Sequence, residues 1–380
     1  MVRRTVVVVG GGIGGLAAAV ALHRRGWRVV VAERAEGFTE VGAGLSLWPN
    51  ALRALEALGL AEQVASLGAV EAGGGVRDRE GRWVARVDNA EIARRHGLPL
   101  TVVRRADLLR VLVEALPPEC LRPGSEVRVV RTSGDQVEVE HRGGRLRAEL
   151  LVGADGLNSA VRRQLWPEVG PPRYRGCTAW RMVTGPLAGV GVDGAVFWGR
   201  GERVGFTRLP GGRFYCFAAA VTPAGGGDGS GEHEAVSRRF RDWPDPIPAL
   251  LAATPRDAVL RHDVHDLPPL PTFVRGRVAL LGDAAHAMDP ILGQGACQAL
   301  EDAVVLADCL DTTPDVDTAL ARYDGSRRPR TLRVARRSAR VGAVSLWSWP
   351  PAVAVRDRVA RLVPATAPLR AMAPVLGWAP

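Results

Sequence analysis

Short apolar runs that pass into glycines mark the beginning of the chain. Residues 6–9 are four consecutive valines, a pattern typical of a strand buried on both faces of a parallel sheet. After the glycines, the apolar stretch 16–22 predicts a helix that ends near Gly26. Residues 29–31 predict a second strand, which finishes at Glu33. Together these segments predict a βαβ unit.

The same kind of pattern predicts the remaining elements of this layer: a helix over 104–116, a strand over 146–152, a buried strand over 278–281 and a helix over 296–310. Between them, residues 171–272 are richer in proline, glycine and aromatic residues. Strand-like runs occur there at 195–198, 203–207 and 214–221. We therefore expect an inserted, mostly antiparallel sheet, and composition makes 222–231 its least ordered segment.

The predicted organisation has three parts. They are a dinucleotide-binding domain made of 1–70, 100–170 and 273–332, a substrate domain made of 71–99 and 171–272, and a C-terminal helical segment, 333–380. The chain has 380 residues, which is enough for two or three domains with a sizeable core.

Composition narrows the possible functions. All 50 basic residues are arginine, which excludes Schiff-base chemistry and the P-loop lysine. Despite the net charge of +10, the arginines are scattered, with local density only at 327–340, so we expect no nucleic-acid partner. No stretch approaches the roughly 18 to 20 apolar residues of a membrane helix. The five cysteines form no CxxC pair, which argues against a metal site or a disulfide framework. With no recognisable signal peptide, we expect a cytoplasmic protein.

The first βαβ unit carries a GxGxxG motif. Its glycines allow a tight turn, close approach of a pyrophosphate and close helix packing, and the helix N-terminus favours the phosphates. Glu33, 23 residues after Gly10, is placed to accept hydrogen bonds from ribose hydroxyls. The motif alone does not distinguish NAD from FAD. The predicted cofactor-binding residues of this unit are Gly10, Gly12, Ile13, Gly14, Gly15, Glu33 and Arg34.

Two further motifs follow predicted strands. Asp155-Gly156 leads into a helix, and taken alone it is better explained as an ordinary turn with Ser159 as the helix N-cap. Asp283 ends the buried strand at 278–281, placed to accept a hydrogen bond from a polyol hydroxyl. The glycines after it allow the backbone to approach a flat ring, near the positive end of a helix. His286 is expected to make a structural hydrogen bond rather than act as a catalytic base.

These three motifs, in this order and with Arg-Arg-Ala-Asp-Leu at 104–108 between the first two, resemble the single-component FAD-dependent aromatic hydroxylases. The resemblance extends from residue 1 to about residue 340 and is most specific at 282–303. Residues 42–50 and 212–215 are similar to the short salicylate and urate hydroxylase-like branch. The implied α/β fold has a Rossmann-like FAD-binding domain with a parallel sheet, an inserted, mostly antiparallel substrate domain and a helical C-terminal segment.

The resemblance also implies roles for particular residues. Glu33 would bind the adenosine ribose, Arg105 would lie along the diphosphate and ribityl chain, and Asp155 would take part in FAD and NAD(P)H interactions. The other implied FAD contacts are Val127 by the adenine, Asp283 on the ribityl chain, and Pro290, Gly293, Gly295 and Ala296 around the isoalloxazine.

The implied reaction consumes NADH or NADPH and O2. Reduced FAD would form a C4a-hydroperoxide, which would transfer one oxygen atom to a small aromatic or heteroaromatic substrate. Within the inserted sheet, Tyr215 and Arg203 are the predicted catalytic residues, on strands that could pair as a hairpin through 210–211. Arg181 and Trp198 are further candidates for the pocket. Each of the four could equally be an ordinary sheet residue.

Three other functions share some of these sequence features. A flavin halogenase of the same superfamily relies on a lysine that this chain lacks, and the tryptophan stretch at 347–350 lies too near the C-terminus for that family's motif. An FAD-dependent reductase or dehydrogenase of a prenyl lipid shares the first and last motifs. A non-enzymatic flavin-binding protein is the remaining alternative.

Overall fold

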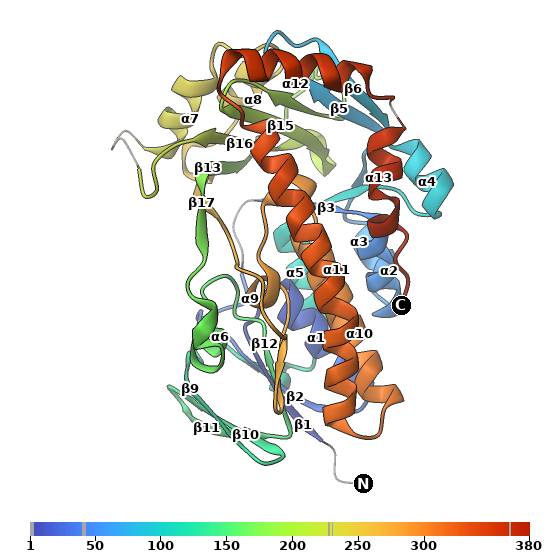
Figure 1. The fold of residues 1–380 in the computed structure, drawn as a ribbon, viewed down its shortest axis with the longest axis vertical. Coiled ribbons are helices and arrows are strands. Elements are labelled where there is room, and N and C mark those ends of the chain that lie inside the picture. Colours follow the sequence, from blue (N-terminus) through green and yellow to red (C-terminus); the bar gives the residue numbers. More distant parts are fainter. Residues whose placement is uncertain (1–3, 40–42, 227–228, 230, 365) are drawn as a thin grey trace.

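The computed structural model describes residues 4–39, 43–226, 229, 231–364 and 366–380. Gly42 of the motif 42–50 and positions 227, 228 and 230 of the segment predicted to be least ordered lie outside the described residues. A parallel sheet lies at one end of the molecule and a larger, mainly antiparallel sheet at the other (Figure 1). A long helix, α11 (Val316–Ser345), runs between them.

The parallel layer is a six-stranded sheet in the order β18-β19-β12-β1-β2-β8. All neighbours are parallel except the edge pair β18 and β19. Its strands are β18 (Val274–Arg275), β19 (Val278–Leu280), β12 (Leu150–Gly153), β1 (Thr5–Val9), β2 (Arg28–Ala32) and β8 (Leu121–Arg122). Val8 in the centre pairs with Val152 on one side and Val31 on the other. All three are fully buried, which explains the uninterrupted valine run.

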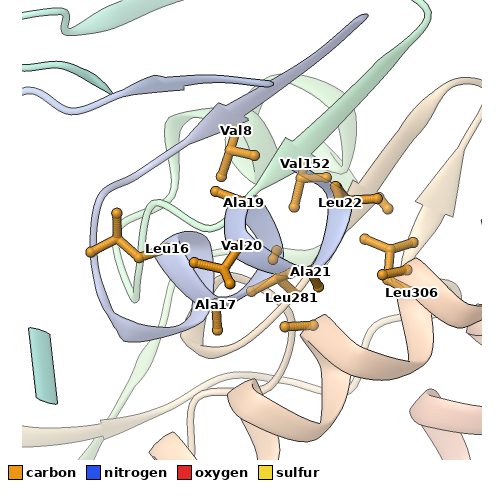
Figure 2. Close-up of a cluster of buried hydrophobic side chains, with 14 of the residues drawn as sticks. Val8, Leu16, Ala17, Ala19, Val20, Ala21, Leu22, Val152, Leu281 and Leu306 are labelled. Carbon is orange, nitrogen blue, oxygen red and sulfur yellow. The ribbon is translucent and has the colours of Figure 1, made fainter. Parts of the chain in front are cut away.

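Helix α1 (Ile13–Arg24) joins β1 to β2, so the predicted βαβ unit is confirmed. Figure 2 shows its side chains between the sheet, represented by Val8 and Val152, and helix α10 (Gly295–Thr312), represented by Leu306. The helix is rich in alanine, and small side chains let two other elements approach it closely. This core fixes the loop between β1 and α1 against the N-terminal end of α10.

The second layer is a seven-stranded sheet in the order β17-β13-β16-β15-β14-β5-β6. Its strands are β17 (Leu260–Asp266), β13 (Arg173–Val183), β16 (Arg213–Val221), β15 (Glu202–Leu209), β14 (Gly194–Trp198), β5 (Gly73–Arg77) and β6 (Trp83–Asp88). Only β14 and β5 are parallel, which confirms a mostly antiparallel inserted sheet. Leu209 pairs with Arg213, so the predicted hairpin through 210–211 is also confirmed.

The two faces of this sheet have different environments. One face carries Phe206, Phe214 and Val204, which pack in a separate core against α7 (Glu232–Phe240) and α8 (Ile247–Ala252). The opposite face is turned toward the parallel layer and α11, where the site described below is built. The alternation of side chains along each strand therefore separates a structural face from a site face.

The remaining strands form two small antiparallel sheets. One contains β11 (Gly144–Ala148), β10 (Gln136–His141) and β9 (Val127–Ser133); the other contains β3 (Gly44–Leu47), β7 (Thr101–Arg104) and β4 (Ala69–Val70). The prediction of one strand over 146–152 was wrong. The chain bends at Glu149, so that β11 pairs with β10 while β12 enters the parallel sheet. The segment is therefore divided between two sheets.

The other helices are α2 (Pro49–Ala57), α3 (Ala61–Ala65), α4 (Ala90–His96), α5 (Arg105–Glu114), α6 (Ala160–Leu165), α9 (Asp283–His286), α12 (Pro350–Leu362) and α13 (Ala367–Leu376). The C-terminal segment is helical, as expected. However, the proposed boundary between residues 332 and 333 falls inside the continuous helix α11. Among the described residues, no helix is long and apolar enough to cross a membrane.

Candidate active site

The loop between β1 and α1 is shaped to accept a phosphate group. Gly10 has φ of +107°, and an added Cβ there would overlap the carbonyl oxygen of Ala154. A Cβ on Gly15 would overlap the carbonyl oxygen of Gly10. Gly12, in contrast, has no atom within 4 Å of its Cβ position and precedes α1, which has no side-chain cap. The tight turn therefore leaves the helix N-terminus open on the side of Gly12, as an anionic ligand requires.

Glu33 lies beside this loop at the end of β2. Its Oε2 accepts a hydrogen bond from the Gly11 N–H at 2.6 Å, and its Oε1 accepts one from the Ala35 N–H at 2.8 Å. Arg34 is exposed next to it. The side chain of Ile13 is buried in the main core, so only its backbone could contact a cofactor. Glu33 thus lies beside the glycine loop, and its contact with a ribose stays a prediction.

Asp155 follows β12 on the other side of Gly10. Its Oδ2 accepts hydrogen bonds from the N–H groups of Ala160 at 2.7 Å and Val161 at 3.2 Å, at the beginning of α6. Ser159 caps the same helix by accepting from the Arg162 N–H at 2.8 Å. The Ser159 N-cap is therefore confirmed. Asp155 Oδ1 is buried and has no hydrogen-bond partner among the described residues, so a cofactor contact stays a prediction for this oxygen.

The third motif forms the opposite wall. Asp283 begins α9 and is exposed, and Gly295 at the start of α10 lies close to its carboxylate. Pro290 begins a short 3-10 turn, which Gly293 ends in the left-handed region with φ of +62°. Helix α10 has no side-chain cap. Several buried polar atoms nearby have no partner among the described residues: Trp48 Nε1, Asn50 Oδ1 and Gln294 Nε2. Buried polar groups are normally satisfied, so these atoms fit a site that is completed by a polar cofactor.

Val127 marks the far end of the predicted cofactor site. It is buried at the beginning of β9 and lines a surface groove of about 440 Å³. The other lining residues are Glu126, Arg128, Ala160, Arg163 and Gln164. The groove adjoins α6, the helix whose first N–H groups bond to Asp155. The contact of Val127 with adenine stays a prediction.

A buried ionic network supports the third motif from behind. Arg327 of α11 donates hydrogen bonds to Glu301 Oε2 at 2.5 Å and Asp302 Oδ1 at 2.6 Å, and all three side chains are fully buried. Asp302 Oδ2 accepts from the Gly282 N–H at 2.9 Å and lies 2.6 Å from His286 Nε2. The expected structural hydrogen bond of His286 is confirmed, with Asp302 as its partner. No sequence motif identifies Arg327 as the partner of Glu301 and Asp302, although it begins the arginine-rich stretch 327–340.

Replacing His286 by alanine should leave coupled turnover within about tenfold, or about 1.4 kcal/mol in the barrier, because its imidazole bonds to Asp302 inside the network. Steady-state product formation measures this effect. Loss of activity in a variant that still binds FAD and melts normally would instead make His286 catalytic.

Strand register brings the predicted substrate residues to one face of the seven-stranded sheet. Tyr215 is directly opposite Val183, two residues from Arg181. Arg203 is opposite Trp198 on one side and Ala219 on the other. Because opposite residues of antiparallel strands share a face, and residues two or four apart do also, all four candidates face the parallel layer.

Tyr215 lies at the centre of a cluster of charged groups. Its ring packs against the backbone of Gly44 in β3, where a Cβ would collide with it. Burial raises the pKa of Tyr215, while Arg181 and Arg105 act in the opposite direction. Burial lowers the pKa of Arg105, an effect that Asp283 opposes and Arg181 reinforces. These residues come from α5, α9, β13 and β16 and converge on the space between the two layers.

His262 joins this cluster from β17 and is not among the residues predicted from the sequence. It lies opposite Ala179 on the same face as Arg181. Burial lowers the pKa of His262, and the positive charges of Arg181 and Arg105 lower it further. No motif marks this histidine, since only strand pairing brings it to the site.

Arg203 has a different environment from Tyr215. It is 2% exposed, donates a hydrogen bond to Ser345 Oγ at 2.6 Å and lies 3.4 Å from Asp289 Oδ1. Asp289 caps the 3-10 turn that begins at Pro290. Arg203 therefore links the sheet to α11 and to the loop of the third motif, and its contact with substrate stays a prediction.

Comparisons with known proteins agree with this geometry. A family model for the FAD binding domain matches residues 3–175 and 270–338. Aurachin C monooxygenase/isomerase of Stigmatella aurantiaca is 40% identical over 361 residues, which cover 94% of each chain. The FAD-dependent urate hydroxylase of Klebsiella pneumoniae is 34% identical over 329 residues, 85% of this chain and 86% of that one. The crystal structure of Klebsiella pneumoniae HpxO complexed with FAD and uric acid superposes with a TM-score of 0.90, at 29% identity and over 98% of this chain and 96% of that chain.

The family match covers the strands and helices that carry all three motifs, together with β5 and β6, and leaves out residues 176–269, which hold β14 to β17 and most of β13. An open helix N-terminus, a carboxylate at each end of the site and unpartnered buried polar atoms fit FAD as the cofactor. The chain is a flavoprotein monooxygenase that belongs to the family of FAD-dependent aromatic hydroxylases.

Proposed function

We propose that this monooxygenase inserts one oxygen atom from O2 into a small aromatic or heteroaromatic ring that carries an acidic group, with NADH or NADPH as reductant. The observation that supports this substrate class is the cluster of Arg105, Arg181 and His262 around Tyr215. An arginine offers fixed donors to an anionic or carbonyl-bearing ring. The uric acid bound in the Klebsiella pneumoniae structure is a ligand of this kind.

FAD would be held at the carboxyl ends of the parallel strands β1, β2, β12 and β19. The open N-terminus of α1 at Gly12 would receive the diphosphate, Glu33 the ribose and Asp283 the ribityl chain. Arg105 and Asp155 would complete these polar contacts, and the backbone at Gly293 would lie against the ring. When bound, FAD activates O2 and supplies the oxygen atom.

The positive charge of the pocket would favour the deprotonated form of the substrate. Arg181 and Arg105 both act on the Tyr215 hydroxyl, and an acidic group bound at the same place would feel the same two charges. Deprotonation increases the electron density of an aromatic ring, which electrophilic oxygen transfer requires. The two arginines would thus orient the ring and keep it reactive.

Tyr215 would orient the substrate without adding charge. Its raised pKa keeps the phenol protonated at neutral pH, so its O–H can donate a hydrogen bond to a ring oxygen or nitrogen. Packing of its ring on Gly44 fixes the direction of that hydroxyl. The neighbouring Phe217 ring covers Gly205 and leaves an apolar wall, which would help to exclude water.

The proposal is tested with matched pairs of aromatic compounds, each comprising a carboxylic acid or phenol and its neutral amide or methyl ether. Substrates of the proposed class should stimulate NAD(P)H oxidation and yield a product with one added oxygen atom. Their neutral counterparts should bind more weakly and give less product. Equal turnover of both members of every pair would contradict the acidic-substrate proposal.

Asp283→Ala should weaken FAD binding by about 1 to 3 kcal/mol, the cost of losing a charge-assisted hydrogen bond to a buried hydroxyl. Flavin fluorescence during titration of the deflavinated protein measures the dissociation constant. Asp135→Ala, in the exposed turn between β9 and β10, serves as the matched control. Unchanged affinity in the Asp283 variant would show that this carboxylate does not bind the cofactor.

A further inference from the structure

Helix α12 presents apolar side chains to the outside of the molecule. Val355 is 59% exposed, Val359 54% and Leu362 76%. Their spacing of four and three residues places them on one side of the helix. A helix that merely packs on a domain turns such a stripe toward the core. Here the stripe faces away from the protein.

The inward side of α12 is held by arginines instead. Arg356 is 5% exposed and donates hydrogen bonds to the carbonyl oxygens of Ser345 at 3.2 Å and Gly199 at 3.1 Å. Its guanidinium also lies 5.4 Å from the ring centroid of Trp198. Arg361 donates to Asp78 Oδ2 at 2.6 Å. Polar contacts therefore attach the helix to the seven-stranded sheet, and its apolar stripe is not needed for attachment.

The exposed apolar surface continues beyond the helix. Trp349 and Trp347, in the segment before α12, are 68% and 40% exposed, and Val221 at the end of β16 is 49% exposed. The Gly201 N–H donates to the Trp347 carbonyl oxygen at 2.9 Å, and the Cβ position of Gly201 lies 3.6 Å from Val221. These contacts join the segment to the β14–β15 turn and to the end of β16. We call the combined surface the α12 patch: Val221, Trp347, Trp349, Val355, Val359 and Leu362.

The charge around the α12 patch is positive. Residues 340–364 contain four arginines and a single acidic residue, Asp357, which pairs with Arg356 at 2.8 Å. Arg358 is exposed on α12 beside the stripe, and Arg340 and Arg200 are exposed on the adjoining α11 and β14–β15 turn. No ion pair is found for these three arginines within the described part of the chain. Their charge is therefore available to an anionic partner.

We propose that the α12 patch docks the enzyme on the surface of an anionic lipid bilayer. Exposed tryptophan, valine and leucine side chains flanked by arginine are the composition of surfaces that insert into the lipid headgroup region. The arginines would meet anionic headgroups, each adding attraction that salt screens. A second copy of the chain would bring the same arginines together, which disfavours self-association. Figure 1 shows α12 along the end of the molecule opposite the N-terminus, where a flat surface can reach it.

Vesicle flotation with the FAD-loaded full-length enzyme tests the proposal. The enzyme should float with vesicles that contain phosphatidylglycerol, float less with pure phosphatidylcholine vesicles, and be released by salt. Val359→Gln/Leu362→Gln should weaken the apparent affinity about tenfold or more, since two apolar side chains would no longer leave water. Arg358→Gln should weaken binding to the anionic vesicles alone, by about fivefold.

Val70→Gln is the matched control, because Val70 is 60% exposed but lies in β4, outside the α12 patch. It should bind vesicles like the wild type. Unchanged FAD content and melting temperature would show that the patch variants remain folded. Absence of flotation with anionic vesicles at low salt, or equal flotation of all variants, would overturn the proposal. A wild-type dimer in sedimentation equilibrium that becomes a monomer in Val359→Gln/Leu362→Gln would also overturn it and make the patch a subunit interface.

Discussion

Replacing Arg327 by alanine should lower the free energy of unfolding by about 3 to 5 kcal/mol. The guanidinium is fully buried and bonds to both Glu301 and Asp302. Its loss removes a counter-charge from two buried carboxylates, which keep only Arg330 and His286 as their respective charged partners. Chemical denaturation followed by tryptophan fluorescence measures the change. Arg333→Ala, at an exposed position of the same helix, should change stability by at most about 0.5 kcal/mol.

The same ionic network should determine how the free energy of unfolding changes at acidic pH. Burial alone would raise the pKa of Asp302, but His286 and Arg327 outweigh it and hold the pKa below its usual value. Because the folded-state pKa is depressed, the resulting stabilisation is present at neutral pH and is lost as the pH falls below about 4. The Arg327 variant should lose part of this acid dependence. A variant as stable as the wild type across this range would contradict the role of the ionic network.

Tyr215→Phe should retain FAD and still oxidise NAD(P)H, but yield about a hundredfold less hydroxylated product and release more hydrogen peroxide. The hydroxyl is the only group removed, and its hydrogen bond would no longer orient the substrate ring. Product and peroxide are quantified together against NAD(P)H consumed. Tyr174→Phe is the matched control, because its hydroxyl donates to the Thr222 carbonyl oxygen at 2.6 Å, within the sheet. Wild-type coupling in Tyr215→Phe would make Tyr215 an ordinary sheet residue.

The cofactor half of the molecule was predictable because its signals are local. The valine run of β1, the glycines after it and the alanine-rich α1 follow one another in sequence, and each forms the structure that its pattern favours. The strand predicted over 146–152 was wrong because two sheets divide this segment at Glu149. Both halves have strand-like sequences, and only their pairing partners show that they form two strands.

The substrate half depends on contacts between distant residues. His262 reaches the cluster around Tyr215 only through the register of β17 on β13. Arg203 bonds to Ser345, 142 positions away, so its environment could not be predicted from its own strand. Arg327 likewise meets Glu301 and Asp302 through the packing of α11 on α10. Such residues are recognised from the sequence as charged or polar, but only the fold identifies their partners.

Oxygen incorporation tests the central claim most directly. The purified enzyme is supplied with NAD(P)H, an aromatic acid or phenol that stimulates turnover, and ¹⁸O₂ in ordinary water. A monooxygenase places one labelled oxygen atom in the product, and mass spectrometry should find this label in nearly all of it. Oxidised product that carries no label, formed at the same rate without O2 when another electron acceptor is present, would contradict the account and indicate a flavin-dependent reductase or dehydrogenase.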